Sequence, residues 1–143
     1  MLDLTSYQSP LEAAVYHALE IAPLAVEALG EMDRLFNSGL RRRSTALAAN
    51  IEAGRFFYDR DLQDLTLLLE PITAAIERGW VTEIIADEHC MSGSWINHRL
   101  NSEAEELRRV AAPLMALHRA LMRIHNVLLA DKAIARMLQN SMG

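Results

Sequence analysis

The stretch SEAEELRRVAAPLMALHRALMRIHNVLLADKAIARML, residues 102–138, decides the fold. Ser102 and Glu105 have the spacing of a capping box, so a helix is expected to begin here and to run over about 103–138. Its apolar residues then alternate steps of three and four, as in a heptad pattern: Leu107, Val110, Leu114, Leu117, Leu121, Ile124 and Leu128. Met115, Met122 and Leu129 widen the apolar arc to roughly 160°, which favours a central helix with more than one neighbour.

A second long heptad-patterned helix is predicted over about 10–36. Ser9, Pro10 and Glu12 are typical of a helix start, and Asn37 to Gly39 are typical of a stop. The apolar seam between them is Leu11, Val15, Ala18, Ala22, Ala25, Leu29, Met32 and Phe36. The seam keeps its register across Pro23, so we expect one kinked helix instead of two.

The rest of the chain indicates shorter helices. One is expected from Leu40 or Ser44 to Tyr58, and another from Asp61 to Arg78, with Asp61 or Asp64 as its N-cap. A short apolar segment follows from Thr82 to about Cys90. No alternation of period two and no hairpin turn signal is recognised, so the prediction is all-α: one helical domain, 1–143, folded as a four- to five-helix bundle.

Composition indicates a cytoplasmic protein. Of 143 residues, 51% are hydrophobic and 23% are charged, as expected for a folded domain. The one cysteine, Cys90, cannot form a disulfide within the chain, and the N-terminus lacks the features of a signal peptide. No uninterrupted apolar run approaches the roughly 20 residues of a membrane helix.

The net charge of −5 conceals an alternation along the chain. Residues 1–40 carry −5 and residues 61–106 carry −8, whereas residues 41–60 carry +3 and residues 107–143 carry +5. Acidic and basic helices can therefore pack side by side, or present patches of opposite charge to partners.

The stretch DEHCMSGSWINHRL, residues 87–100, raises the question of a metal or catalytic site. A ferritin-like centre needs Glu-x-x-His pairs, and the chain contains none. Glu88, His89 and His98 could at most supply two or three zinc ligands, which leaves metal binding as a weaker alternative. The favoured interpretation is a polar elbow in which Ser94 caps a short turn.

Catalysis and cofactors are not expected. The acidic neighbours of Cys90 disfavour a thiolate, and no nucleophile elbow, phosphate loop or dinucleotide fingerprint occurs. His118 and His125 fall inside the apolar arc of the last helix, about 10 Å apart along its axis, too far to share one ion easily. They are interpreted as core or interface residues.

The features in favour of a protein interaction module are the two long helices, the methionines and the charge blocks. We expect a homodimer with the last helix at the interface and helix 10–36 as a further candidate for it. The expected interface residues are Leu107, Val110, Leu114, Met115, Leu117, His118, Leu121, Met122, Ile124, His125 and Leu128.

An arginine-rich patch supports an alternative function. It comprises Arg41, Arg42, Arg43, Arg55 and Arg60, with aromatic residues between the last two. Arginine beside aromatic rings is typical of nucleic-acid binding, although a pI near 5.5 argues against it. The sequence thus predicts a non-enzymatic adaptor, chaperone-like or regulatory protein that binds a protein partner, with a nucleic-acid-associated regulator as the alternative and a metal-binding protein as the weaker one.

Overall fold

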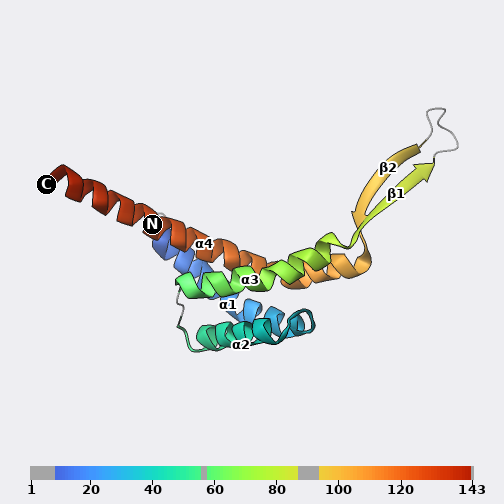
Figure 1. Ribbon diagram of the computed structural model, residues 1–143, viewed down its shortest axis with the longest axis horizontal. Helices are drawn as coiled ribbons and strands as arrows, with labels where there is room; N and C mark the ends of the chain where they lie inside the picture. Colours follow the sequence, from blue (N-terminus) through green and yellow to red (C-terminus); the bar gives the residue numbers. More distant parts are fainter. Residues whose placement is uncertain (1–8, 56–57, 87–93, 143) are drawn as a thin grey trace, which may run out of the picture.

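The computed structural model describes residues 9–55, 58–86 and 94–142 (Figure 1). Four α-helices make up most of these residues, with one two-stranded sheet, so the all-α prediction is confirmed. The sheet is a correction, because no strand was expected.

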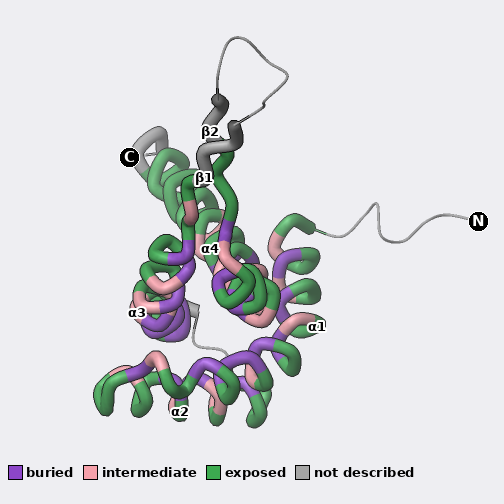
Figure 2. Tube along the Cα trace, turned by 90° about the vertical axis from the view of Figure 1, so that its right-hand side faces the viewer, coloured by how far each residue is buried: buried purple, intermediate pink, exposed green. Residues whose placement is uncertain are grey.

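Helix α4, Ser102–Met142, is the central element and packs against both α1, Pro10–Glu31, and α3, Tyr58–Glu77. Figure 2 shows α4 between α3 and α1. Helix α2, Ser38–Glu52, lies across the lower side of the bundle in this view and contacts α3 and α1. At 1.5 Å per residue, the 41 residues of α4 span about 60 Å. The helix is longer than predicted, and its C-terminal part extends beyond the rest of the bundle (Figure 1).

Small side chains allow α1 and α4 to lie close together. The buried face of α1 consists mainly of alanines: Ala14, Ala18, Ala22, Ala25 and Ala28. The hydroxyl of Ser9 caps the helix by accepting a hydrogen bond from the Glu12 backbone N–H at 3.1 Å. Pro23 is exposed and does not break the helix, which ends at Glu31 and is followed by a 3-10 turn, Asp33–Leu35.

Three predicted helix boundaries are wrong. The helix expected to reach Tyr58 ends at Glu52. Asn37 does not terminate a helix; its side-chain oxygen accepts a hydrogen bond from Leu40 N at 2.9 Å and caps the start of α2. Asp61 and Asp64 do not cap α3, which begins at Tyr58; both side chains are buried within the helix. They face α2, where Asp64 accepts from Arg43 and Asp61 accepts from Asn50.

Residues 80–86 and 94–100 form an antiparallel pair of strands, so the short turn expected after Ser94 is wrong, and the segment expected from Thr82 to about Cys90 is a strand as far as Ala86. The rest of that segment lies outside the described residues. Strand β1, Trp80–Ala86, pairs with β2, Ser94–Leu100, from Trp80 opposite Leu100 to Ala86 opposite Ser94. Figure 1 shows this hairpin extending away from the helices. Neither strand therefore needs the alternating apolar face by which strands are recognised in sequences.

The hairpin joins the bundle at a tight junction. The backbone N–H of Asn101 donates to the carbonyl of Gly79 at 2.8 Å, which links the two ends of the hairpin. The side chain of Asn101 accepts from Ala104 N at 2.8 Å and therefore caps α4, one residue before the expected cap Ser102. Gly79 is buried against the first turn of α4.

By length and composition alone, α1 is apolar enough to cross a membrane, with a mean hydropathy of 1.2, and no other helix in the described ranges is. The apolar residues of α1 still do not form one uninterrupted run, because glutamates are spaced along the helix. In the bundle, 33% of that window is buried, against the core.

Candidate interaction surface

Most of the apolar residues expected at an interface lie in the chain's own core. Those that are buried are Leu107, Leu114, Leu117, Leu121 and Ile124, whereas Val110, Met115 and Leu128 are half-buried. The helices of one chain therefore already cover this part of the wide apolar arc. Met122, with 38% of its surface exposed, remains available to a partner together with the two histidines beside it.

His118 connects α4 to α3 through Thr66. The Thr66 hydroxyl donates its hydrogen to the Leu62 carbonyl at 2.7 Å, so it can only accept from the imidazole Nε2, which lies 3.1 Å away. This contact requires a proton on Nε2. Burial, followed by the positive charge of Arg119, lowers the pKa of His118 and favours its neutral form.

His125 lies two turns further along and faces Asp59 at the start of α3, with 3.2 Å between Nδ1 and Oδ1. An open hollow of about 640 Å³ lies between the two helices at this point. Its lining is both apolar and polar: Arg43, Asp59, Leu62, Gln63, Thr66, Leu67, Met122 and His125. We call it the α3/α4 hollow.

The predicted arginine patch is only partly assembled. Arg42, Arg43 and Arg60 line a second hollow, of about 750 Å³, between α2 and α3. Arg41 lies elsewhere and faces Asp33 at 3.4 Å, and Arg55 does not line the hollow. The two hollows share Arg43 and Gln63, so the arginines and the histidines belong to one continuous surface.

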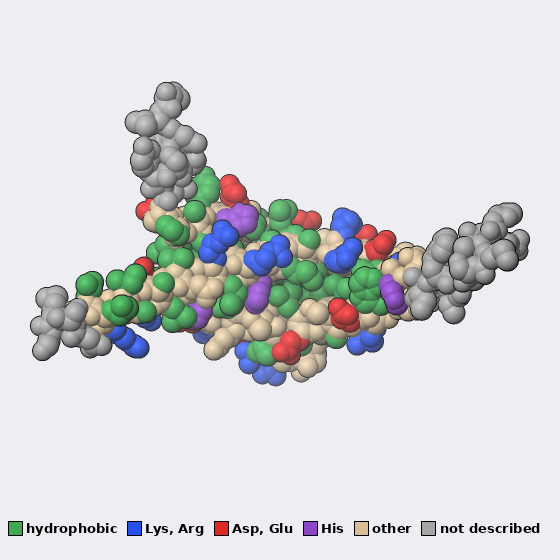
Figure 3. Space-filling view, turned by 90° about the horizontal axis from the view of Figure 1, so that it is seen from above, with side chains coloured by type: hydrophobic (Ala, Val, Ile, Leu, Met, Phe, Trp, Pro, Cys, Tyr) green, Lys and Arg blue, Asp and Glu red, His purple; other side chains and the backbone are tan. Residues whose placement is uncertain are grey.

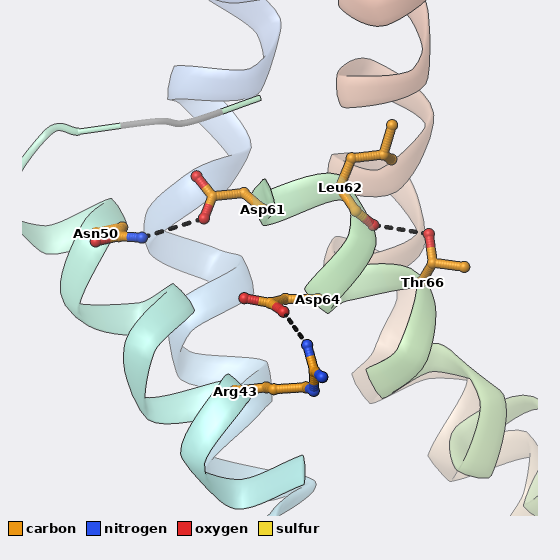
Figure 4. Close-up of polar contacts among 6 residues, drawn as sticks. All are labelled: Arg43, Asn50, Asp61, Leu62, Asp64 and Thr66. Atoms are coloured by element: carbon orange, nitrogen blue, oxygen red, sulfur yellow. Dashed lines mark hydrogen bonds and ion pairs between the residues drawn. The ribbon is translucent and has the colours of Figure 1, made fainter. Parts of the chain in front are cut away.

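Two buried acids of α3, Asp61 and Asp64, hold polar side chains of α2 in place under this surface. Arg43 Nη1 lies 2.7 Å from the carboxylate of Asp64, which is almost fully buried (Figure 4). Asn50 donates from its side-chain amide to Asp61 at 3.2 Å. These contacts join α2 to α3 and set the position of the Arg43 side chain.

The outer face of α4 continues the surface toward the C-terminus. It begins at His118 and includes Arg119, Met122, Arg123, Asn126, Val127 and Ala130. Figure 3 shows basic and histidine side chains along this helix with apolar side chains beside them. Beyond Ala130 the exposed apolar residues are Ile134, Met137 and Leu138.

The described residues include no group of three or more histidine, cysteine or acidic side chains able to hold a metal. Of the three residues considered for zinc, Glu88 and His89 lie outside the described ranges, as does Cys90. His98 is exposed on β2, and its Nδ1 lies 3.3 Å from the Thr82 hydroxyl across the hairpin.

Apart from Arg60, sequence reasoning missed the polar residues that α3 contributes to this surface, namely Asp59, Gln63 and Thr66. The apolar spacing of α3 did indicate that Asp61 is buried. Asp61 precedes Leu65, Leu68 and Ile72 at steps of four, three and four, a position where an apolar residue is expected. The chain matches no protein-family model, no curated protein and no solved structure.

Proposed function

We propose that this protein is a non-enzymatic, cytoplasmic interaction module that binds a protein partner through α4. The observation that carries the proposal is the C-terminal part of α4, residues 129–142, which we call the α4 arm. It extends past the other helices (Figure 1) and exposes large apolar side chains: Leu129, Ile134, Met137 and Leu138.

An arm of this kind favours a partner for two reasons. A helical segment of about 14 residues is marginally stable in water unless something packs against it. Exposed apolar residues that share a helix face also mark interaction sites, and Ile134 with Leu138 has the spacing by which helices dock into grooves. The adjoining surface, with Met122 and the arginines of α2 and α3, can extend the contact.

The test compares the wild-type chain with a variant that carries Ile134→Asp and Leu138→Asp. Gln139→Asp is the matched control, because it adds a charge to the same arm at an exposed polar position. A partner captured from a native cell extract must bind as a purified protein to the wild type and the control and not to the double variant. If no purified protein, including the chain itself, distinguishes these variants, the proposal is refuted.

A second candidate function is that of a nucleic-acid-associated regulator. The observation in its favour is that Arg42, Arg43 and Arg60 gather around one hollow. Arg42→Glu with Arg60→Glu tests it and leaves the ion pair of Arg43 intact. Retention of single-stranded RNA or DNA should fall in the variant and weaken with salt. Equal retention, or none by the wild type, refutes this candidate.

A further inference from the structure

We propose that the partner of the α4 arm is a second copy of this chain, and that the arm docks on the outer face of the partner's α1. This inference rests on the proposed function and specifies its partner. The α1 outer face is the exposed set Glu12, Tyr16, Leu19, Glu20, Leu24 and Glu27.

The α1 outer face combines acidic and large apolar side chains. Tyr16 is 61% exposed, Leu19 49% and Leu24 55%, so three large apolar side chains share one exposed helix face. The charged residues of α1 are all glutamates, and the helix contains no lysine or arginine. This face therefore favours a partner that is apolar and positively charged.

The α4 arm has the complementary chemistry. Leu129 is 49% exposed and shares one face of the arm with Lys132 and Arg136, since these residues are three and four positions apart. Ile134, which is 56% exposed, lies with Leu138 on the opposite face. Asp131 is the one acid of the arm. This face of the arm thus offers Leu129 beside two cations, as the α1 outer face offers apolar side chains beside three anions.

Geometry assigns this contact to two different copies. The first turn of α1 lies beside the point where α4 leaves the bundle, and the arm continues outward from there (Figure 1). Because α4 is one continuous helix to Met142, the arm cannot fold back onto the α1 of its own chain. A second copy, turned by a two-fold rotation about this point, brings each arm onto the α1 of the other.

The two-fold arrangement makes the same contact twice and closes on itself, as most homodimers do. Two helix contacts bring the buried area toward the roughly 1,200 Å² at which stable interfaces begin. The core of each bundle stays unchanged, because α1 and α4 use their outer faces.

Two charge-reversed variants test the docking. The first carries Glu12→Lys and Glu20→Lys on α1, the two acids of its outer face nearest to the start of the arm, and the second carries Lys132→Glu and Arg136→Glu on the arm. All four positions are exposed, so both variants should keep the fold. At low salt, sedimentation of the purified wild type should show dimers, and each variant alone should dissociate about 30-fold more readily, or ~2 kcal/mol at 1.4 kcal/mol per tenfold.

Mixing the two variants should restore the dimer. In the mixed pair, a basic arm meets an acidic α1 and an acidic arm meets a basic α1, so both contacts are again attractive. Native mass spectrometry distinguishes this heterodimer from either homodimer, and 1 M salt should weaken it.

Three outcomes would overturn the inference: a monomeric wild type, a dimer that tolerates both reversals, or variants that do not pair when mixed. A monomer whose arm still binds another purified protein, with the dependence on Ile134 and Leu138 tested above, would leave the proposed function standing. If the wild type neither forms dimers nor binds any other purified protein through the arm, both this inference and the proposed function are refuted.

Discussion

Replacing Gly79 by alanine should destabilise the junction between α3, the hairpin and α4. A methyl group on Gly79 would overlap the Cβ of Ala104 in the first turn of α4 and lie 3.2 Å from both Asn101 Oδ1 and the Ile76 carbonyl. The last two contacts are tight, and the overlap with Ala104 requires the backbone of α4 to move.

The expected loss follows from opposing effects. Forcing an extra methyl group into a packed site costs about 1–3 kcal/mol. Gly79 does not have a positive φ, so alanine recovers about 0.5 kcal/mol by restricting the unfolded chain. The net expectation is a loss of about 1–2 kcal/mol, which for a chain of this size lowers the melting temperature by roughly 3–7 °C.

Urea unfolding followed by circular dichroism at 222 nm measures this loss. The matched control is Gly30→Ala in α1, where no atom lies within 4 Å of the new methyl group, and alanine should stabilise the helix by about 0.5–1 kcal/mol. Ala104→Gly removes the obstructing methyl, so the double variant should be about 1–2 kcal/mol more stable than the sum of the single changes predicts. Additive effects, or a Gly79→Ala midpoint equal to the wild type, would refute the steric argument.

Other positions give further predictions. Arg43→Ala should cost about 1–2 kcal/mol in urea unfolding, since it leaves the buried Asp64 carboxylate without its ion pair, whereas Arg42→Ala should be nearly neutral; equal effects would contradict this. Burial lowers the pKa of His118 below 6.5, so the unfolded chain binds this proton more tightly and stability should be lost as pH falls through about 6.5. Unfolding midpoints between pH 5 and 8 check this, and His118→Gln should reduce the slope. Leu121→Ala should cost about 2–5 kcal/mol, because the side chain is fully buried; a loss below 1 kcal/mol would rule out a central position for it.

The sequence predicted the two long helices best, because their buried residues recur with the period of a helix over many turns. The seam of α4 and the alanine face of α1 repeat over many turns, so the burial of Leu114 and Leu121 follows from the apolar pattern itself. Helix starts were less predictable, because Asn37 is compatible with both a stop and a cap until the direction of its side chain is known.

The hairpin was missed for a physical reason. Its strands extend away from the helices (Figure 1), and WVTEIIA and SWINHRL do not alternate apolar and polar residues as strands that cover a core do. The signal that was available is composition, because Val81, Thr82, Ile84 and Ile85 are β-branched. The candidate surface was half predicted: His118, Met122 and Arg43 were identified individually, but their proximity depends on how α2 and α3 pack.

The junction at Gly79 and Asn101 also bears on how this chain tolerates changes in length. Because one backbone hydrogen bond joins the two residues, β1 leaves the bundle and β2 returns to it at nearly the same point. The entropy of closing a loop grows only logarithmically with its length, so adding or deleting residues between them changes the closure cost of the bundle very little. The hairpin is therefore a segment whose length and sequence evolution or engineering can alter while the four helices keep their arrangement.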